Sequence, residues 1–337
     1  MRRQLLHHCQ KLISEMAEES RRKPDPVLGE MPKHVKERIA DHVDAYTKTI
    51  VRLCSKELKS LADNAKVYYS WLKIKLNLDG VEVRVHYNFN ELARVSVVFH
   101  NYGGCLEAEY RNLGMRKLMD RRDYEEAIRT VAKMLNNSNC SFGTITVEDV
   151  WGNHPQRRIR RNRFYLELGR NLWQLQNPLD VEEVRGDARA TSLLLRRTKP
   201  GLLKKICVES DHSVHDFRSL VDFEQWRQAK SIIIRVDSDL KLADVLHADS
   251  IELQMRNIGF DDFEKLIEIA SGPVKKSFTL RSSQYSKPKI DQFLEDYPYV
   301  QENYNKLYTL DKVTVTTKLD QSVDDSKIFV QIETREN

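Results

Sequence analysis

Apolar and polar residues alternate along several segments that follow residue 71. The clearest are LKIKLNL at 72–78, VEVRVHYNF at 81–89 and ARVSVVFH at 93–100. Because successive side chains of a strand point to opposite faces, this alternation predicts strands with one face in water. Residues 120–135 space their apolar side chains as a helix does, and GTITVED at 143–149 predicts another strand.

The order of strand and helix recurs toward the C-terminus. Strand-like apolar cores centre on Ile206, Ile233, Leu253 and Leu280, about 20 to 27 residues apart, with short helices predicted between them. Such an interval is typical of leucine-rich repeats, although the asparagine ladder of those repeats is missing here. We therefore expect an irregular, leucine-rich-repeat-like domain, with an ordinary α/β layer as the alternative.

Two shorter signals concern the ends of elements. Asp261 and Glu264 have the spacing of a capping box at a helix start, since each side chain could accept a bond from the other's backbone amide. Near the C-terminus, KVTVTTKL at 312–319 and KIFVQIE at 327–333 flank a polar turn. This arrangement predicts a closing β-hairpin.

The N-terminal part has helical periodicity throughout. Residues 1–29 predict a short helix and a linker, because two prolines interrupt the polar stretch SRRKPDP. Residues 30–63 predict two short amphipathic helices. Each has more apolar face than the pair can bury, so the segment must pack on the C-terminal domain or on a partner. The fold class we predict is α/β (α+β), with a helical N-terminal domain before the repeat-like domain.

Composition narrows the class of protein. A chain of 337 residues suggests about two domains. The five cysteines are odd in number and widely separated, so neither a disulfide framework nor a paired-cysteine zinc site is indicated. Neither a membrane-spanning apolar run nor a secretory signal is found in the sequence. We expect a cytoplasmic or nuclear protein without a membrane partner.

Catalytic motifs are missing from the sequence. It contains no GxxxxGK[ST], GxGxxG after a strand, GxSxG or HExxH, so we expect a binding protein without a cofactor, not an enzyme. The segment with Asp211, His212, His215 and Asp216 could hold zinc, but an exposed acidic loop has the same composition. We therefore do not expect a metal site.

The densest positive charge is the run RRIRRNRFY at 157–165. Arginines that bind phosphates, with Phe164 or Tyr165 stacking on a base, would indicate a nucleic-acid interface. The alternative is a core helix, because Phe164, Leu168, Leu172 and Leu175 form one apolar stripe. Positive charge opposes the dipole at a helix N-terminus, so acidic groups of this chain or of a protein partner should meet it. We therefore do not expect a nucleic-acid partner, and a role of the run in nuclear import stays open.

Two regions resemble a known family. The pattern of Met-Pro at 31–32, then Val35, Ile39 and Asp44, and the run IVRLC before Leu58, resembles an F-box. Downstream, FEQWRQAKSIIIR, DSIELQMRNIGFDDFEKLIEIA and KKSFTLRSS resemble the FTH domain, an F-box-associated region abundant in nematodes. LLKKICVES and YGGCLEAEY fit the same family. Trp226 lies in the first of these motifs and, on residue type, is expected to be a core aromatic.

The resemblance implies a substrate-recognition subunit of an SCF (cullin-type) ubiquitin ligase. It implies that the F-box binds a Skp-family adaptor through Met31, Pro32, Val35, Ile39, Val43, Ile50, Leu53 and Cys54. The resemblance implies an F-box-like domain at 30–66 and an FTH-like target-binding domain at 70–310. The residue pattern adds a helix and linker at 1–29 and a C-terminal hairpin and tail at 311–337. An adaptor-independent protein-interaction module is the alternative, and the target stays unknown.

Overall fold

The computed structural model describes most of the chain after residue 63 and part of the chain before it. The described residues are 31–42, 60, 64–77, 80–86, 94–100, 105–110, 115–120, 124–150, 157–210, 217–238, 240–285, 292–302, 305–310, 313–319 and 328–334.

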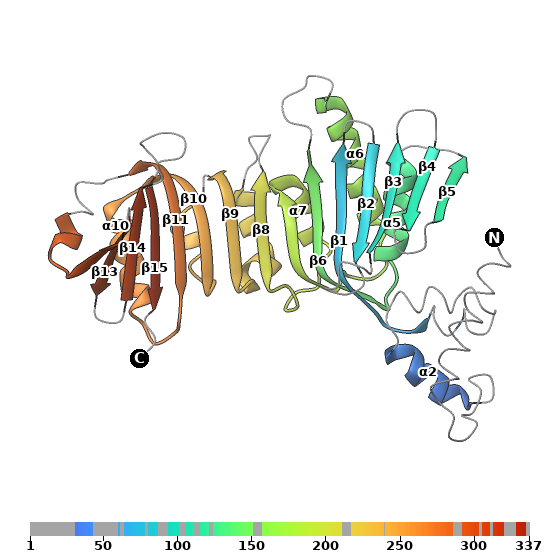
Figure 1. Cartoon of the computed structure of the whole chain (residues 1–337), viewed down its shortest axis with the longest axis horizontal. Coiled ribbons are helices and arrows are strands. Elements are labelled where there is room, and N and C mark those ends of the chain that lie inside the picture. The colour runs from blue at the N-terminus through green and yellow to red at the C-terminus, as the bar shows by residue number, and fades with distance from the viewer. Residues whose placement is uncertain are drawn as a thin grey trace.

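The described strands form one sheet of 15 strands (Figure 1). Its order is β12-β13-β14-β15-β11-β10-β9-β8-β7-β6-β1-β2-β3-β4-β5. One end is an antiparallel meander of β1 (Val67–Asn77), β2 (Gly80–His86), β3 (Arg94–His100), β4 (Cys105–Tyr110) and β5 (Met115–Asp120). β1, β2 and β3 contain the described parts of the first three alternating segments, so the prediction of strands there is confirmed.

The middle of the sheet is parallel. Starting beside β1, its strands follow one another in chain order: β6 (Cys140–Asp149), β7 (Val181–Asp187), β8 (Lys205–Ser210), β9 (Ser231–Ser238), β10 (Ser250–Ile258) and β11 (Ser277–Tyr285). Each of the four predicted strand cores, Ile206, Ile233, Leu253 and Leu280, lies in one of these strands. Their order and spacing agree with a repeat, while the leucine-rich-repeat-like interpretation stays a prediction.

The far end of the sheet is antiparallel again. It contains β12 (Tyr299–Glu302), β13 (Asn305–Leu310), β14 (Val313–Leu319) and β15 (Ile328–Thr334). The predicted C-terminal hairpin is confirmed, because β14 and β15 pair antiparallel. β15 also pairs with β11, so the hairpin continues the same sheet.

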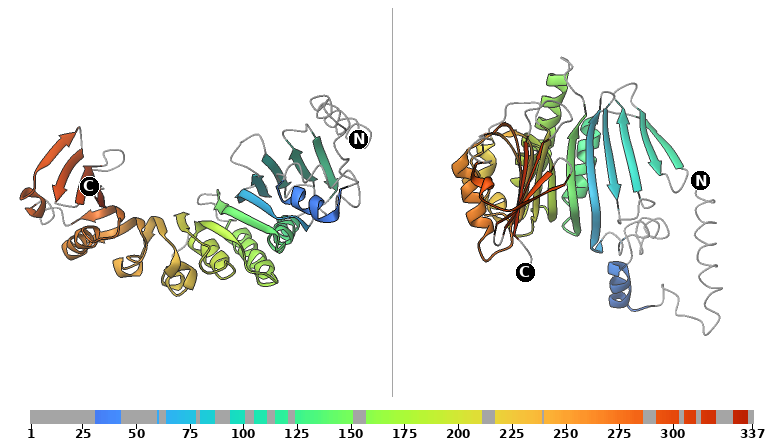
Figure 2. Two further views of the ribbon diagram at one scale, coloured as in Figure 1. Left: turned by 90° about the horizontal axis from the view of Figure 1, so that it is seen from below. Right: turned by 60° about the vertical axis from the view of Figure 1, so that its left-hand side comes forward.

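The helices between residues 124 and 270 lie on one face of the sheet. They are α5 (Tyr124–Leu135), α6 (Arg157–Trp173), α7 (Ala188–Leu195), α8 (Arg218–Val221), α9 (Glu224–Gln228), the 3-10 turn η2 (Leu242–Asp244) and α10 (Phe260–Ala270). Figure 2 (left) shows the sheet curved, with these helices along its outer side. None of the described helices is long and apolar enough to cross a membrane.

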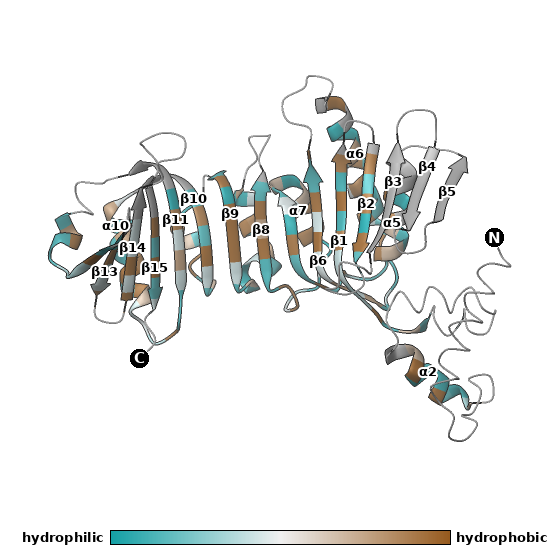
Figure 3. Cartoon of the chain, viewed as in Figure 1, coloured by the Kyte–Doolittle hydropathy of each residue, from teal (hydrophilic) through white to brown (hydrophobic). Residues whose placement is uncertain are grey.

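The core lies between the parallel strands and these helices. Alternate residues of β8 to β11 are no more than 1% exposed and face the helices: Ile206, Val208, Ile232, Ile234, Ile251, Leu253, Phe278 and Leu280. Figure 3 shows the resulting alternation of hydrophobic and hydrophilic bands along these strands. Trp226 of α9 is fully buried and donates from Nε1 to the carbonyl of Asp244 at 2.9 Å, so its assignment to the core is confirmed.

The predicted capping box at Asp261 is wrong. Helix α10 begins at Phe260, and its N-cap is Gly259, which makes no side-chain cap. Asp261 is therefore already inside the first turn, where its negative charge can still interact favourably with the helix dipole. The spacing of apolar residues predicts the helix correctly, whereas residue type does not predict where it begins.

Candidate functional site

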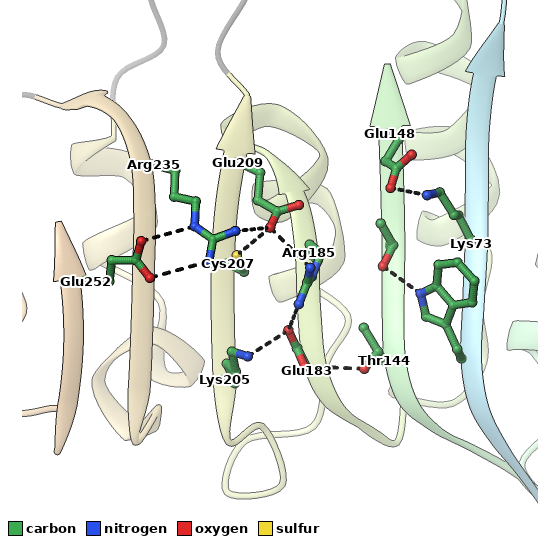
Figure 4. Close-up of polar contacts among 12 residues, drawn as sticks. Lys73, Thr144, Glu148, Glu183, Arg185, Lys205, Cys207, Glu209, Arg235 and Glu252 are labelled. Carbon is green, nitrogen blue, oxygen red and sulfur yellow. Dashed lines mark hydrogen bonds and ion pairs between the residues drawn. The ribbon is translucent and has the colours of Figure 1, made fainter. Parts of the chain in front are cut away.

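The face of the parallel sheet opposite the helices carries a continuous row of polar side chains (Figure 4). Because side chains alternate along a strand, burying one set against the helices turns the other set to this open face. We call the set that links β7 to β11 the charged row. Its members are Glu183, Arg185, Lys205, Glu209, Arg235, Glu252 and Arg281.

In the first half of the charged row, the carboxylates of Glu183 and Glu209 interact with Arg185 and Lys205. Arg185 on β7 donates from Nη2 to Glu183 at 2.9 Å and from Nη1 to Glu209 on β8 at 3.1 Å. Lys205 lies 3.4 Å from Glu183. These bonds join adjacent strands because Glu183 is level with Lys205, and Arg185 with Cys207, in the register of β7 and β8.

The second half continues from the same Glu209 carboxylate. Arg235 on β9 donates from Nη1 to Glu209 at 2.9 Å and from Nε to Glu252 on β10 at 3.2 Å. Arg281 on β11 lies 3.3 Å from Glu252. Five strands are thereby linked by alternating acidic and basic groups.

The charged row is ordered but still accessible. Arg235 and Arg281 are 44% and 52% exposed, whereas Glu252 between them is 18% exposed. An isolated exposed ion pair contributes at most about 1 kcal/mol to stability, and networks hold geometry better than single pairs. The row therefore presents charges in fixed positions to anything that approaches this face.

Cys207 lies beneath the charged row and is fully buried. Burial, and next the negative charge of Glu209, raise the pKa of its thiol to about 12. Its Sγ lies 3.5 Å from the Glu209 carboxylate. A thiol with so high a pKa is a poor nucleophile, which argues against a catalytic role for this cysteine.

An aromatic cluster lies where the open face reaches β1. Trp71 donates from Nε1 to the Thr146 hydroxyl at 2.9 Å and packs edge-on to His86, with 4.8 Å between ring centroids. Lys73 forms an ion pair with Glu148 and places its Nζ 5.2 Å from the Trp71 ring. Partly exposed tryptophan beside charged groups is typical of protein-binding surfaces.

The chemistry of this face favours recognition of a protein. The charged row has four basic and three acidic members, so it lacks the excess of positive charge on which phosphate-backbone binding depends. Within the described residues, no group of three or more histidine, cysteine or carboxylate side chains is arranged to hold a metal. The predicted zinc candidates Asp211, His212, His215 and Asp216 lie outside the described residues.

The arginine run begins helix α6, and Arg161 forms internal ion pairs. Its guanidinium donates to Asp149 at 3.1 Å and to Asp187 at 3.0 Å. Asp187 is 1% exposed, caps α7 by accepting from the Ala190 amide at 2.7 Å, and also accepts from the Tyr165 hydroxyl at 2.5 Å. This Asp187 cluster supplies the acidic groups expected near the helix start.

Base stacking on the aromatics of the run is contradicted. Phe164 and Tyr165 are 1% and 2% exposed, so their rings are not available to a nucleic acid. Burial, followed by the Asp187 charge, raises the pKa of Tyr165 well above its ordinary value. The side chains of Arg157, Arg158 and Arg160 lie outside the described residues.

Of the predicted adaptor-binding residues, half lie in a described segment. Met31 and Pro32 precede α2 (Lys33–His42), and the Pro32 carbonyl accepts from the amides of Val35 and Lys36. Val35 is half-buried and Ile39 is 37% exposed. Lys36, between them in the sequence, is 8% exposed. Val43, Ile50, Leu53 and Cys54 lie outside the described residues, as does the predicted second helix.

Sequence reasoning missed the charged row. A signal exists, because Glu183, Arg185, Glu209, Arg235 and Glu252 all occupy polar positions of alternating strands. The pairs that form between these charges depend on the register of neighbouring strands, and a single sequence does not provide that register.

We predict that the Asp187 cluster holds α6 and α7 on the sheet. Asp187→Ala should lower the free energy of unfolding by about 3 to 5 kcal/mol, because it removes one of the two carboxylate partners of the mostly buried Arg161, the partner of the buried Tyr165 hydroxyl and a helix cap. Urea unfolding measures this. The matched control is Glu182→Ala, whose ion pair with Lys204 is exposed and should cost at most about 1 kcal/mol. Equal losses in the two variants would contradict the prediction.

Cys207 gives a second prediction, on pH. Because its pKa is raised on folding, the folded state keeps the thiol proton that the unfolded state loses above about pH 9. The free energy of unfolding should therefore fall between pH 8.0 and 10.5 by up to about 2 kcal/mol more in the wild type than in Cys207→Ala. Urea unfolding in reducing buffer measures the difference. If the free energy of unfolding fell with pH equally in both proteins, the Cys207 thiol would not be held protonated by burial.

Comparison with known proteins identifies one region. No curated protein and no solved structure matches the chain. The strands β7 to β11, which carry the charged row, all lie between residues 165 and 297. That is the part of the chain matched by the family model described as the FTH domain, which supports the FTH half of the resemblance.

Proposed function

We propose that this protein is a substrate-recognition subunit of an SCF-type ubiquitin ligase that binds its protein target through the open face of the sheet. The observation that carries the proposal is the charged row, which lies within the region matched by the FTH family. FTH domains are F-box-associated, so a protein-interaction role fits this match. The protein works by binding, in the cytoplasm or the nucleus, and other subunits supply the ubiquitin chemistry.

The geometry of the charged row suits a broad protein partner. It extends over five adjacent strands, and neighbouring strands lie about 4.8 Å apart, so its width is about 19 Å. This is the scale of a standard protein interface, which buries about 800 Å² on each partner. Alternating charges with fixed partners select a complementary charge pattern and disfavour others.

The N-terminal half of the proposal rests on residues 30–66. In Figure 1 and in the right view of Figure 2, α2 lies apart from the sheet. Ile39 on this helix is partly exposed, as an adaptor-binding residue must be. We propose that it contacts a Skp-family adaptor together with Met31, Pro32, Val35, Val43, Ile50, Leu53 and Cys54, and that the adaptor connects the chain to a cullin.

The adaptor contact predicts the behaviour of Ile39→Asp in the full-length protein. A buried charge at a central anchor should weaken adaptor binding by at least about 2 kcal/mol, or roughly 30-fold in Kd. Binding of purified Skp-type adaptor, measured by calorimetry, tests this. The matched control is Val274→Asp, an apolar-to-acid change at a residue that is 55% exposed and lies after α10.

Two results would contradict the adaptor role. The first is that the wild-type protein binds no Skp-type adaptor, in which case the chain is an adaptor-independent interaction protein. The second is that Ile39→Asp abolishes the cooperative thermal melt that Val274→Asp retains. The segment would then be part of the folded core, as the alternative interpretation expects.

A further inference from the structure

Helix α6 exposes a row of large apolar side chains on the side turned away from the core. Ile159, Leu166 and Trp173 are 77%, 55% and 68% exposed. They are spaced by seven residues, so they lie almost above one another, with a drift of about 20° per interval. The buried residues of the same helix, Phe164, Leu168 and Leu172, lie on its opposite side. We call Ile159, Leu166 and Trp173 the apolar row.

The apolar row ends at a hollow between α6, α7 and the start of α9. The hollow has a volume of about 310 Å³, near the lower limit for a ligand pocket. Gly169 lies at the contact of α6 with α7, where an added Cβ would come within 3.3 Å of the Leu193 side chain. Apolar groups form most of the lining, with two arginines at the α7 end: Leu172, Trp173, Leu193, Phe223, Arg196 and Arg197.

Positive charge accompanies the apolar row. Helix α6 contains six arginines and a single glutamate, Glu167. Arg163 and Arg170 are exposed and are also seven residues apart, so they form a second row on the same outer side. Arg196 lies against the Phe223 ring at 5.8 Å and is exposed beside the hollow. An apolar surface bordered by arginines is complementary to an apolar segment that carries acidic residues.

We propose that this surface binds an acidic amphipathic helix of a partner protein. The partner's apolar stripe lies on Ile159, Leu166 and Trp173, one of its large side chains enters the hollow, and its carboxylates face Arg163, Arg170 and Arg196. Ile159 and Trp173 are 14 positions apart, or about 21 Å along the helix, which corresponds to about four turns of the partner. Recognition of an amphipathic helix in a groove works through such spaced anchors.

The hollow favours a helix over two other partners with related chemistry. A membrane surface could also attract apolar and basic groups, but it offers no side chain to fill a hollow. A nucleic acid would use the arginines, yet the exposed apolar row would contribute little to phosphate contacts. The surface lies on the helical side, opposite the charged row, so the proposal does not depend on the SCF role and both faces can be occupied together.

The test uses the full-length protein and a displayed library of 18-residue peptides of random sequence. Selection on the wild type should enrich peptides with apolar residues at helical spacing and carboxylates beside them. Fluorescence anisotropy of the enriched peptides should show Kd at least tenfold weaker for Trp173→Ser and for Leu166→Ser. Val274→Ser, at an exposed apolar residue elsewhere, should bind as the wild type does.

Charge complementarity is tested on the same peptides. The double variant Arg163→Glu with Arg170→Glu should raise the Kd of the acidic peptides at least tenfold. Replacing the peptides' carboxylates with lysine should restore part of their binding to this variant.

Trp173→Ser and Leu166→Ser control for each other against misfolding. Both residues are exposed, so both variants should melt as the wild type does.

Three results would overturn the proposal. The first is that the selected peptides bind Trp173→Ser and Leu166→Ser as tightly as the wild type. The second is that selection enriches no acidic amphipathic sequence. The third is that vesicles with 30% anionic phospholipid, or single-stranded RNA, bind in a Trp173-dependent manner while the peptides do not, which would assign the surface to a membrane or to a nucleic acid.

Discussion

Helices cover only one face of the parallel sheet, and most other features of the structure follow from this constraint. Parallel strands are usually buried on both faces, but here the helices that connect β6 to β11 all lie on the same side. The covered face can therefore be apolar, whereas the open face has to carry side chains that remain stable in water. The charged row meets this requirement by pairing its charges across strands, and the same pairing makes it a suitable recognition surface.

The helical side depends on one buried carboxylate. Asp187 ends β7, caps α7 and accepts hydrogen bonds from Arg161 and Tyr165 of α6. Because it connects a strand to two helices, it fixes the rotation of α6 about its axis. With Phe164 and Leu168 turned inward, Ile159, Leu166 and Trp173 must point outward. A single internal cluster thus determines which apolar residues remain available to a partner.

The sequence predicts elements well and their mutual contacts poorly. Alternation placed the strands around Ile206, Ile233, Leu253 and Leu280, and apolar spacing placed the helix after Phe164, because burial against one face leaves a periodic signal. The capping box at Asp261 was misplaced, since residue type alone does not set the first turn. Acidic groups of this chain or of a partner are expected near the arginine run, and Arg161 of α6 pairs with Asp149 and Asp187. These two residues end the neighbouring strands β6 and β7, and the register that brings them close is not encoded locally.

We propose above that the charged row recognises a protein target. The most direct measurement compares the proteins captured from cell extract by full-length wild type and by Arg235→Gln with Arg281→Gln, quantified by mass spectrometry. Lys199→Gln with Lys204→Gln removes the same charge at exposed positions outside the row. If the charged row binds the target, the first variant, although folded, loses at least nine tenths of the captured target that the second retains. Equal capture by both variants would contradict it.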